Sequence, residues 1–414
     1  MTIIDSLLDT DFYIFTMMQA TFHQYPGTWT KFEFDWRNAN QMDFYSEEIS
    51  KEYESFIEYF CEEVKDEIDN LCSLRFKRDE LEYLSRIPYF TKDFIAYLEL
   101  FRLNRDYIKV KPDYKSIINI TIEGPLLNVI MFEVPVLAIV SQVSSRICAS
   151  FNSLSVKYGC SEIYRKTLEL KMRYIKKNAY NDFTIADFGT RRRAFKFLQD
   201  SLISELSTEK FFAGTSNVFL AKKYNVKPIG TMAHLWIQIH QQTGTRLIDS
   251  QAAALQNWAN EYRGELGIAL SDTITFNAFL KDFDRYFALL FDGCRHDSGD
   301  PYLWGDKLIK HYEKLRINPK TKTAVFSDGL TIEKALNIHK YFRDRIKVSF
   351  GIGTNLTNDC GVTPPQIVIK NTECNGQPTA KISDSEGKGM CKDDAYFEYL
   401  KKIIRDKIIR REHV

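Results

Sequence analysis

The segment Asp187-Phe-Gly-Thr-Arg-Arg-Arg193 gathers an acid, an aromatic ring and three guanidinium groups within a few residues. Guanidinium forks bind carboxylate and phosphate groups through paired hydrogen bonds, and an aromatic ring offers a face on which a flat ligand can stack. The alternative is a helix start with solvated arginines, but basic side chains there oppose the positive end of the helix dipole. We therefore predict that this segment binds an anion, and an aromatic acid fits it best.

Two short loops, Gly214-Thr-Ser-Asn217 and Gly351-Ile-Gly-Thr-Asn355, combine glycine with hydroxyl and amide side chains. Backbone amides and hydroxyls in such loops can cradle a phosphate group. Loops of this composition also cap ordinary helices, so each one alone supports both interpretations equally.

The run Arg295-His-Asp-Ser-Gly-Asp300 is the densest polar segment of the chain. Its acids could hold ribose hydroxyls directly, or Mg²⁺ bound to a pyrophosphate. Asp272 and Asp328 end two neighbouring predicted strands and would add carboxylates to the same place. A transition-metal site at His296 is the alternative, but no His-x-x-His or cysteine pair accompanies it, so we expect no metal site formed by the protein alone.

His234 ends the segment Gly230-Thr-Met-Ala-His234, which we expect to be a strand. A single histidine beside apolar residues is usually a buried core side chain. At the end of a strand, among loops that suit phosphate, it could instead be a nucleophile or an acid-base group. The pattern alone leaves both possibilities open.

The elements that would position these residues repeat one order between residues 184 and 355: a short apolar strand, a polar cluster, then a helical pattern. We expect helices at 193–206, 276–290, 302–315 and 332–345. The seven strand-and-cluster units lie at residues 185–190, 211–216, 228–234, 268–273, 291–300, 324–329 and 348–354. Such alternation predicts parallel strands wound by helices.

We predict an α/β fold, an irregular (β/α) barrel of parallel strands with a second, smaller α+β domain. Polar clusters follow every strand, as in barrel enzymes, whereas a dinucleotide-binding sheet concentrates them at one switch point and carries a glycine fingerprint that is absent here. The expected domains are an α+β domain at 1–125, with an amphipathic helix at 46–74, and the barrel at 126–360. A hairpin at Asn375-Gly376 and a final helix, in 361–414, are expected to return to the N-terminal domain.

Composition excludes several classes of protein. With 56 basic and 55 acidic residues, the net charge of +1 gives no overall field for nucleic acid. We find no uncharged stretch of about 18 residues that would cross a membrane, and no secretory signal at the start. Eight scattered cysteines fit a reducing cytoplasm. The basic segment 401–411 is interpreted as a solvated terminal helix rather than as a nucleic-acid or membrane patch.

Taken together, these motifs resemble the nicotinate phosphoribosyltransferase family, the bacterial and fungal-type branch of the type II phosphoribosyltransferases, nearly from end to end. The motifs that carry the resemblance are Ser6-Leu-Leu-Asp-Thr-Asp-Phe-Tyr13, Glu123-Gly-Pro125, Glu133-Val-Pro135, Asp187-Phe-Gly-Thr-Arg-Arg-Arg193, Gly214-Thr-Ser-Asn217, Gly230-Thr-Met-Ala-His234, Arg295-His-Asp-Ser-Gly-Asp-Pro301, Phe326-Ser-Asp328 and Phe350-Gly-Ile-Gly-Thr354. The fold that the resemblance implies is an irregular α/β barrel joined to a smaller α+β domain.

The resemblance also implies roles for single residues. The catalytic residues would be His234, as the histidine that ATP phosphorylates, with Asp272 and Asp297. Nicotinate would be bound by Tyr13 and Phe188, which sandwich its ring, by Arg191 near its carboxylate, and by Ser216. The groups for 5-phosphoribosyl-1-pyrophosphate (PRPP) would be Thr215, Arg295, Ser298, Asp300, Asp328, Gly353 and Thr354. Two positions depart from the family pattern: Ile14 where lysine is usual, and Leu235 where some relatives have an acid.

The reaction implied is the transfer of the phosphoribosyl group of PRPP to nicotinate, coupled to ATP hydrolysis through a phosphohistidine, with Mg²⁺ bound through substrate phosphates. We expect a cytoplasmic monomer or homodimer whose partners are nicotinate, PRPP and ATP, with no nucleic acid and no membrane. A nicotinamide enzyme is the nearest alternative, but such enzymes typically carry Asp in place of Ser216, which would repel a carboxylate. A quinolinate enzyme, which would be shorter, and a non-catalytic metabolite sensor are further alternatives.

Overall fold

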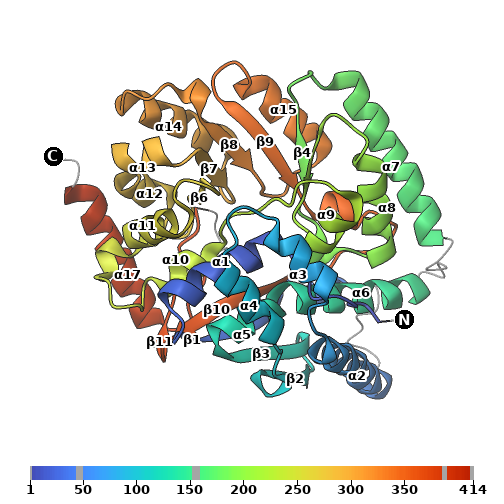
Figure 1. Ribbon diagram of the computed structural model, residues 1–414. Helices are drawn as coiled ribbons and strands as arrows, with labels where there is room; N and C mark the ends of the chain where they lie inside the picture. Colours follow the sequence, from blue (N-terminus) through green and yellow to red (C-terminus); the bar gives the residue numbers. More distant parts are fainter. Residues whose placement is uncertain (1, 43–49, 152–158, 385–388, 411–414) are drawn as a thin grey trace.

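The computed structural model describes residues 2–42, 50–151, 159–384 and 389–410. It contains a five-stranded sheet and a six-stranded sheet, which occupy the lower and upper parts of Figure 1. The five-stranded sheet is antiparallel and the six-stranded sheet is parallel. These two sheets confirm the predicted α/β class.

The antiparallel sheet combines strands from both ends of the chain in the order β11-β10-β1-β3-β2. Its strands are β1 (Trp29–Trp36), β2 (Ile108–Asp113), β3 (Ile117–Pro125), β10 (Ile367–Cys374) and β11 (Gln377–Pro378). The turn between β10 and β11 contains Asn375 and Gly376, both with positive φ, which is the backbone that an Asn-Gly hairpin turn requires. The pairing of β10 with β1 brings the C-terminal hairpin to the N-terminal strands.

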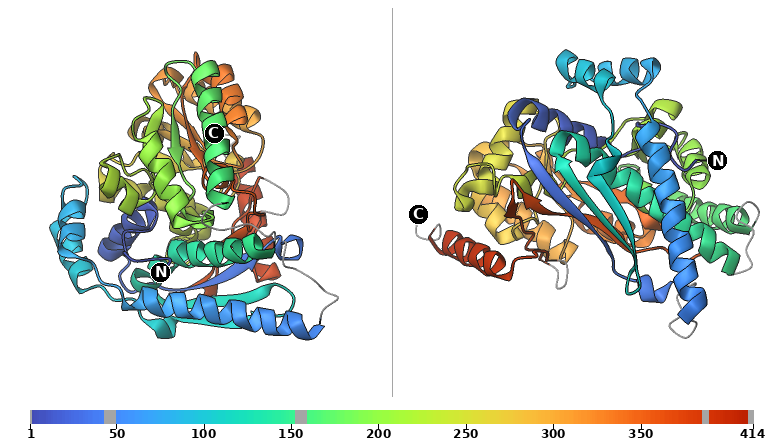
Figure 2. Two further views of the ribbon diagram at one scale, coloured as in Figure 1. Left: turned by 90° about the vertical axis from the view of Figure 1, so that its right-hand side faces the viewer. Right: turned by 90° about the horizontal axis from the view of Figure 1, so that it is seen from below.

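Helices of residues 12–151 share one apolar core with the antiparallel sheet. These helices are α1 (Phe12–Gln24), α2 (Ser50–Ser73), α3 (Arg78–Ser85), α4 (Lys92–Leu100), α5 (Leu126–Val129) and α6 (Glu133–Phe151). Helix α2 packs against β2 and β3 and runs along the outer side of this part of the molecule (Figure 2). It occupies most of the amphipathic helix expected at 46–74, of which residues 46–49 lie outside the described residues.

The parallel sheet has the order β5-β4-β9-β8-β7-β6. Its strands are β4 (Ile185–Asp187), β5 (Phe212–Thr215), β6 (Ile268–Leu270), β7 (Gly293–His296), β8 (Thr323–Phe326) and β9 (Lys347–Ile352). Its helices are α7 (Gly159–Asn178), α8 (Lys196–Leu206), α9 (Val218–Tyr224), α10 (His234–Ile239), α11 (Ser250–Tyr262), α12 (Phe276–Asp282), α13 (Arg285–Leu290), α14 (Pro301–Lys314), α15 (Ile332–Phe342) and α16 (Thr354–Thr357). Within the described part of the chain, the edge strands β5 and β6 do not pair with each other, so closure of the sheet into a barrel stays a prediction.

Six of the seven predicted strand units form strands of this sheet, and the unit at 228–234 does not. Pro228 lacks an N–H for the ladder, and the segment makes only an isolated bridge between Pro228 and Thr215. His234 is consequently the first residue of helix α10 rather than the last residue of a strand. The helix expected at 276–290 is divided into α12 and α13, because Asp284 begins α13 as a new cap.

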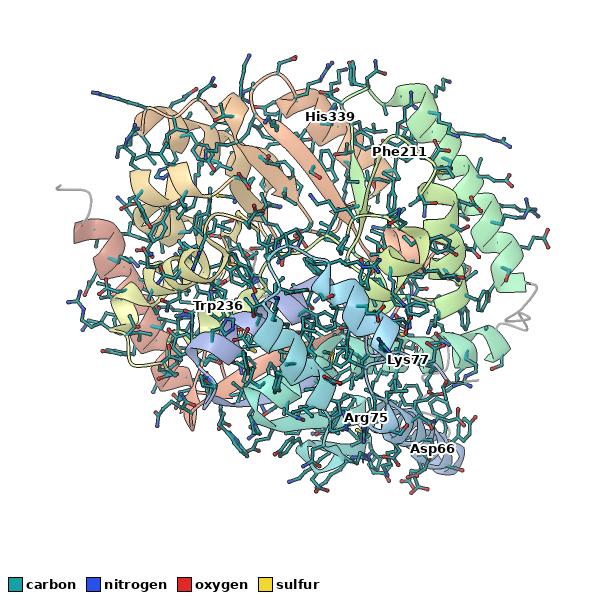
Figure 3. The ribbon with its side chains drawn as sticks, in the orientation of Figure 1. Asp66, Arg75, Lys77, Phe211, Trp236 and His339 are labelled. Carbon is teal, nitrogen blue, oxygen red and sulfur yellow. The ribbon has the colours of Figure 1, made fainter. Side chains whose placement is uncertain are left out.

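Helix α6 bears on the expectation that the chain has no membrane segment. The stretch Leu126–Ser150 is long and apolar enough to cross a membrane by length and composition, and 78% of its most apolar window is buried inside the protein. Helix α6 packs against α2, β10 and the short helix η4 (Thr190–Arg192). The apolar residues of this stretch therefore form part of the core of the protein. Side chains fill the space around the two sheets (Figure 3), where Trp236 of α10 is completely buried.

The last helix, α17 (Asp394–Arg410), was expected to return with the hairpin to the N-terminal domain. The main contacts of α17 are with α12 of the parallel part, whereas the hairpin strand β10 pairs with β1. Leu400 and Ile404 of α17 share a small apolar cluster with Ile274 and Ala278, and Lys407 forms a buried ion pair with Asp282. Arg411, the end of the expected basic helix, lies outside the described residues.

Candidate active site

The site residues gather where the carboxyl ends of the parallel strands meet the N-terminal segment of the chain. Ser216, directly after β5, accepts a backbone hydrogen bond from Phe12 and donates its hydroxyl to Asp11 at 2.7 Å. Thr16 of α1 donates to the backbone of Thr231 at 2.6 Å, and Met17 contacts Ala233, next to His234. Helix α1 is thereby fixed against the segment that leads to His234.

Asp187, at the end of β4, is a buried carboxylate held by several hydrogen bonds. It accepts hydrogen bonds from Gln199 at 2.9 Å, from Thr215 at 2.8 Å and from the amide of Gly189 at 2.9 Å. Burial raises the pKa of Asp187 to about 6, against the effect of these hydrogen bonds. Thr215 is fully buried and its hydroxyl is used by Asp187, so the expected contact of this hydroxyl with phosphate is not supported.

The three consecutive arginines point to different environments. Arg193 is fully buried and binds both carboxylate oxygens of Asp9, at 2.7 and 2.8 Å. Arg192 donates to the backbone of Ile367 in β10 at 3.0 Å. The side chain of Arg191 remains 45% exposed. Of the predicted cluster of three guanidinium groups, Arg191 is therefore the one best placed to bind an external anion.

Arg191 shares a corner of the site with Tyr13 and Glu133. The Tyr13 hydroxyl donates to Oε1 of Glu133 at 3.0 Å, and Nη1 of Arg191 lies 4.0 Å from the same oxygen. Burial raises the pKa of Glu133 to about 7, although Arg191 and the Tyr13 hydrogen bond act in the opposite direction. Burial also raises the pKa of Asp11, which lies near this corner.

Phe188 directly follows β4, and its ring packs against Gly351 of the neighbouring strand β9. A Cβ atom on Gly351 would lie 2.2 Å from two ring carbons of Phe188, so only glycine allows the ring this position. Gly353 and Thr354 follow β9 directly and begin the short helix α16 beside the backbone of Phe188. The predicted stacking face and the predicted phosphate loop therefore adjoin each other at the ends of β4 and β9.

His234 forms a compact cluster with Asp272 and Lys381. Its Nε2 lies 3.0 Å from Oδ1 of Asp272 and 2.7 Å from Nζ of Lys381, and Lys381 also donates to Oδ2 of Asp272 at 2.9 Å. Burial would raise the pKa of Asp272, but His234, Lys381 and the Ser298 hydroxyl hold it well below its usual value. Burial and Lys381 together lower the pKa of His234, against the effect of Asp272.

Asp297 connects this cluster to the arginines. Its Oδ2 lies 3.7 Å from Nε2 of His234, and its Oδ1 accepts from Ser327 at 2.8 Å. Burial alone would raise the pKa of Asp297, but Arg295 and His234 lower it overall. The charge of Asp297 also acts on Arg191, so the two groups of residues lie close enough to interact electrostatically.

The remaining predicted phosphate ligands divide into two sets. Ser298 is buried and donates to Asp272 at 2.7 Å, and Asp300 caps helix α14 through the amide of Leu303 at 2.8 Å. Both side chains therefore already have a hydrogen-bond partner within the protein, and their contact with phosphate stays a prediction. Arg295 and Asp328 lie partly exposed at the ends of β7 and β8.

Sequence reasoning missed Lys381 and did not assign a role to Glu133. Lys381 follows the β10–β11 hairpin, far from every strand-end cluster, and no local motif marks it. The bridge between Ile274 and Ile382 places it, because Ile382 exchanges backbone hydrogen bonds with Thr273 and Thr275 just after Asp272. Only the tertiary return of the C-terminal segment brings Lys381 to His234.

His234, Asp272 and Asp297 could hold a metal ion, since one ligand atom from each lies within 4.8 Å of the others. The ammonium of Lys381 already lies 2.9 Å from Asp272 and would compete with a permanently bound cation. Mg²⁺ prefers carboxylate and phosphate oxygens, so the two carboxylates suit Mg²⁺ that arrives with a phosphate group. His296 does not extend this cluster, because it is buried against Trp304 and Phe326.

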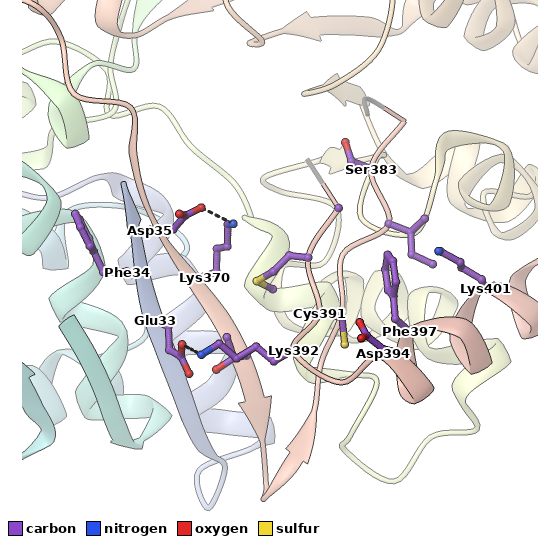
Figure 4. A pocket seen from close by; sticks show the side chains of 14 residues that line it. Glu33, Phe34, Asp35, Lys370, Ser383, Cys391, Lys392, Asp394, Phe397 and Lys401 are labelled. Carbon is purple, nitrogen blue, oxygen red and sulfur yellow. Dashed lines mark hydrogen bonds and ion pairs between the residues drawn. The ribbon is translucent and has the colours of Figure 1, made fainter. Parts of the chain in front are cut away.

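A cleft of about 670 Å³ lies beside this site rather than in it. Figure 4 shows its lining, in which Asp35 pairs with Lys370 and Glu33 with Lys392. Ile382 lines this cleft, whereas its neighbour Lys381 contacts His234. Its charged side chains are largely neutralised in pairs, so it is a poorer candidate than the strand-end cluster.

Comparisons with known proteins agree with this geometry. The sequence profile of the nicotinate phosphoribosyltransferase (NAPRTase) family matches residues 183–407, and that of the N-terminal domain of the same family matches residues 8–141. The chain is 47% identical to a nicotinate phosphoribosyltransferase of Xylella fastidiosa over 406 residues, which cover 97% of this chain and 98% of that protein. It is 46% identical to one of Acinetobacter baumannii, covering 97% of each chain.

Solved structures give the same result. A crystal structure of nicotinate phosphoribosyltransferase from Vibrio cholerae has a TM-score of 0.88 and 36% identity, covering 100% of this chain and 97% of that chain. One from Porphyromonas gingivalis has a TM-score of 0.86 and 33% identity, covering 97% of this chain and 100% of that chain. The similarity therefore extends over nearly the whole chain and includes both sheets.

Proposed function

This chain belongs to the nicotinate phosphoribosyltransferase family of enzymes, and we propose from that membership that it joins nicotinate to PRPP, coupled to ATP hydrolysis. The products are nicotinate mononucleotide and pyrophosphate, with ADP and phosphate from ATP. Within the site, the proposal rests on Arg191, an exposed guanidinium that lies near Tyr13 and interacts electrostatically with Asp297, a neighbour of His234. This arrangement supports a ligand with a carboxylate at one end and a reacting atom at the other.

In the transfer, the pyridine nitrogen of nicotinate attacks the anomeric carbon of PRPP as the bond from that carbon to the diphosphate oxygen breaks. The transition state resembles an oxocarbenium ion, so the chain must position the ring and stabilise separated charges. Tyr13 and Phe188 would hold the ring and Arg191 its carboxylate. Asp297 and Asp328 would bind the ribose and its diphosphate, while Gly353 and Thr354 would receive the 5-phosphate. Mg²⁺ bound to the diphosphate would neutralise charge on the leaving group.

His234 would couple ATP to this transfer. A ring nitrogen attacks the terminal phosphorus of ATP, ADP leaves, and the phosphoryl group is later transferred to water. The depressed pKa of His234 supports this role, because only the neutral imidazole has a lone pair for attack. Asp272 would orient the ring, and Lys381 would lie beside the transferred phosphoryl group.

We also infer that segment 228–233 closes the parallel sheet into the irregular (β/α) barrel of the family. On one side Pro228 bridges to Thr215 of β5, and the Ile229 amide donates to the Thr215 carbonyl at 2.9 Å. On the other side the Thr231 hydroxyl donates to the backbone of Ile268 in β6 at 2.9 Å. The segment thus lies between the two edge strands without forming a regular ladder.

The test is product analysis with nicotinate, nicotinamide and quinolinate, each with PRPP, with and without ATP. Nicotinate should give the main product, and ATP should increase its yield. The variant Arg191→Ala should lose about 1.5–3 kcal/mol of transition-state binding for nicotinate, because a hydrogen bond to a charged group is removed. This loss corresponds to a decrease of roughly 10- to 150-fold in kcat/KM for nicotinate, and kcat/KM for nicotinamide should change much less. A main product from nicotinamide, or carbon dioxide release from quinolinate, would contradict the proposal.

A further inference from the structure

Glu133 occupies an unusual position beside the proposed nicotinate carboxylate. It lies at the start of α6 with its side chain 12% exposed, accepts a hydrogen bond from Tyr13 at 3.0 Å, and lies 4.0 Å from Arg191. Both of these neighbours are proposed to bind nicotinate, which stacks on the Tyr13 ring and pairs with Arg191, so the ligand and Glu133 require the same cation.

The charges around Glu133 do not balance once a ligand carboxylate arrives. The groups that act on its charge are Arg191, Tyr13 and Asp11, from η4, α1 and the segment before α1. Tyr13 stays neutral, because burial and the charge of Glu133 raise its pKa well above the usual value. Arg191 is thus the single cation among these groups. A nicotinate carboxylate would be a further anion next to Glu133 and Asp11.

We propose that Glu133 is a positioning residue that binds Arg191 in the absence of nicotinate, releases it to the nicotinate carboxylate, and takes up one proton from water as it does so. This inference rests on the proposed function. In its neutral form Glu133 keeps its hydrogen bond to Tyr13, so the aromatic ring stays in position while Arg191 becomes free. The proton removes the repulsion that two adjacent carboxylates would otherwise share.

Proton uptake fixes the sign of the pH dependence. The free enzyme has a pKa of about 7 for Glu133, and the nearby nicotinate anion raises that pKa further in the complex. Nicotinate therefore binds best below pH 7, and its affinity falls as the pH rises through the pKa of the free enzyme. By linkage, one such proton weakens binding about tenfold between pH 6 and pH 8.

The experiment compares kcat/KM for nicotinate in the wild type and in Glu133→Gln from pH 6 to pH 8, at saturating PRPP and ATP. Glutamine keeps the size and a hydrogen-bond acceptor for Tyr13 but does not titrate. Ionisations of PRPP, ATP and His234 are common to both proteins and cancel in their ratio. The ratio of wild type to variant should fall about tenfold over this range, and the change should be in KM rather than in kcat.

A matched control is Glu80→Gln, another buried glutamate, which accepts hydrogen bonds from Ser6 and Lys77 outside the site. This variant should keep the wild-type profile. Glu133→Asp keeps a titrating carboxyl in an altered position and should keep a pH midpoint that is displaced, which tests the idea even if glutamine prevents folding. A constant ratio across pH, or an unchanged midpoint with aspartate, would overturn the inference. Failure of the wild type to use nicotinate at any pH would instead overturn the proposed function.

Discussion

The ring nitrogen Nε2 of His234 lies between a carboxylate and an ammonium group. Asp272 at 3.0 Å favours the protonated imidazole, whereas Lys381 at 2.7 Å and burial favour the neutral one. The balance lies on the neutral side. A neutral imidazole can accept a phosphoryl group, and Lys381 supplies positive charge where the phosphoryl oxygens would arrive.

Replacing Lys381 by Gln should therefore raise the pKa of His234. Loss of the ammonium leaves Asp272 as the dominant charge beside the ring, and a carboxylate favours the imidazolium form. The variant should be phosphorylated more slowly than the wild type near pH 6 and should recover part of the rate above the new pKa. NMR titration of the His234 ring measures the shift directly.

A suitable control is Lys370→Gln, because Lys370 pairs with Asp35 in the neighbouring cleft and does not contact His234. It should leave the titration of His234 unchanged. If Lys381→Gln lowers the pKa of His234 or leaves it unaltered, Lys381 does not set the charge state of the ring.

Single residues were predictable where chemistry and local sequence coincide. Arg191, His234 and Asp297 lie in polar runs at the ends of predicted strands, and the structure places Asp297 3.7 Å from His234 and within electrostatic reach of Arg191. Lys381 was not predictable, because its position depends on a hairpin and an isolated bridge far along the chain. Thr215, by contrast, belongs to a recognisable loop but points inward, since a short strand alternates its sides and Asp187 needs a donor.

At the scale of elements, the approach of β4 to β9 determines where the ring of Phe188 lies. Ile185, Ala186 and Asp187 pair with Phe350, Gly351 and Ile352 in register, and Phe188 continues this ladder by donating to the Ile352 carbonyl. The missing side chain of Gly351 leaves the space that the ring occupies.

Replacing Gly351 by Ala should displace Phe188 and raise the KM for nicotinate. The added methyl group would lie 2.2 Å from the ring, far inside van der Waals contact, and overpacking of this kind typically costs about 1–3 kcal/mol. Steady-state kinetics measures the change in KM, and a thermal melt measures the loss of stability. Gly27→Ala, where no atom lies within 4 Å of the new methyl group, is the matched control and should change neither value.

Wild-type KM in Gly351→Ala would show that the Phe188 ring does not contact nicotinate.

The order of strands and helices was predictable, because the apolar strands and their helices have clear periodicity. The unit at 228–234 has the same composition as its neighbours, but Pro228 and Gly230, with its positive φ, prevent a regular ladder. His234 accordingly begins a helix in the structure.

At the scale of the whole molecule, the C-terminal segment joins the two sheets. Strand β10 pairs with β1, Lys381 then reaches His234, and α17 finally packs on α12. Lys407 fixes this last helix from a fully buried position, where it binds Asp282 and donates to the backbone of Ile248 at 2.6 Å.

Replacing Lys407 by Met should destabilise the protein by about 3–5 kcal/mol, because it leaves Asp282 buried without its cation. Replacing Asp282 by Leu in the same chain should restore most of that loss. Urea unfolding measures both. Lys401→Met in the same helix removes a surface pair with Glu398 and the contact of the Lys401 ammonium with the Phe397 ring, and should cost about 1 kcal/mol. A double variant as unstable as the single one would contradict this explanation.

Such long-range contacts explain what the sequence could not show. The basic, amphipathic pattern of α17 predicts a helix, but not which domain buries its apolar face. The stretch Leu126–Ser150 passes as a membrane helix by length and composition, although Glu133 and Arg146 interrupt it, and its neighbours α2, β10 and η4 show that it belongs to the core. The α/β class was predictable, because alternating strands and helices are a local property.

The most direct test of the ATP-coupled transfer is incubation of the protein with γ-labelled ATP. The wild type should acquire an acid-labile, base-stable label, as a phosphohistidine requires. His234→Asn should acquire none, because asparagine lacks the imidazole nitrogen while keeping similar size. The variant should still form nicotinate mononucleotide slowly, and ATP should no longer stimulate it. Undiminished label in the variant, or ATP stimulation that persists in it, would contradict the role of His234 and with it the coupled mechanism.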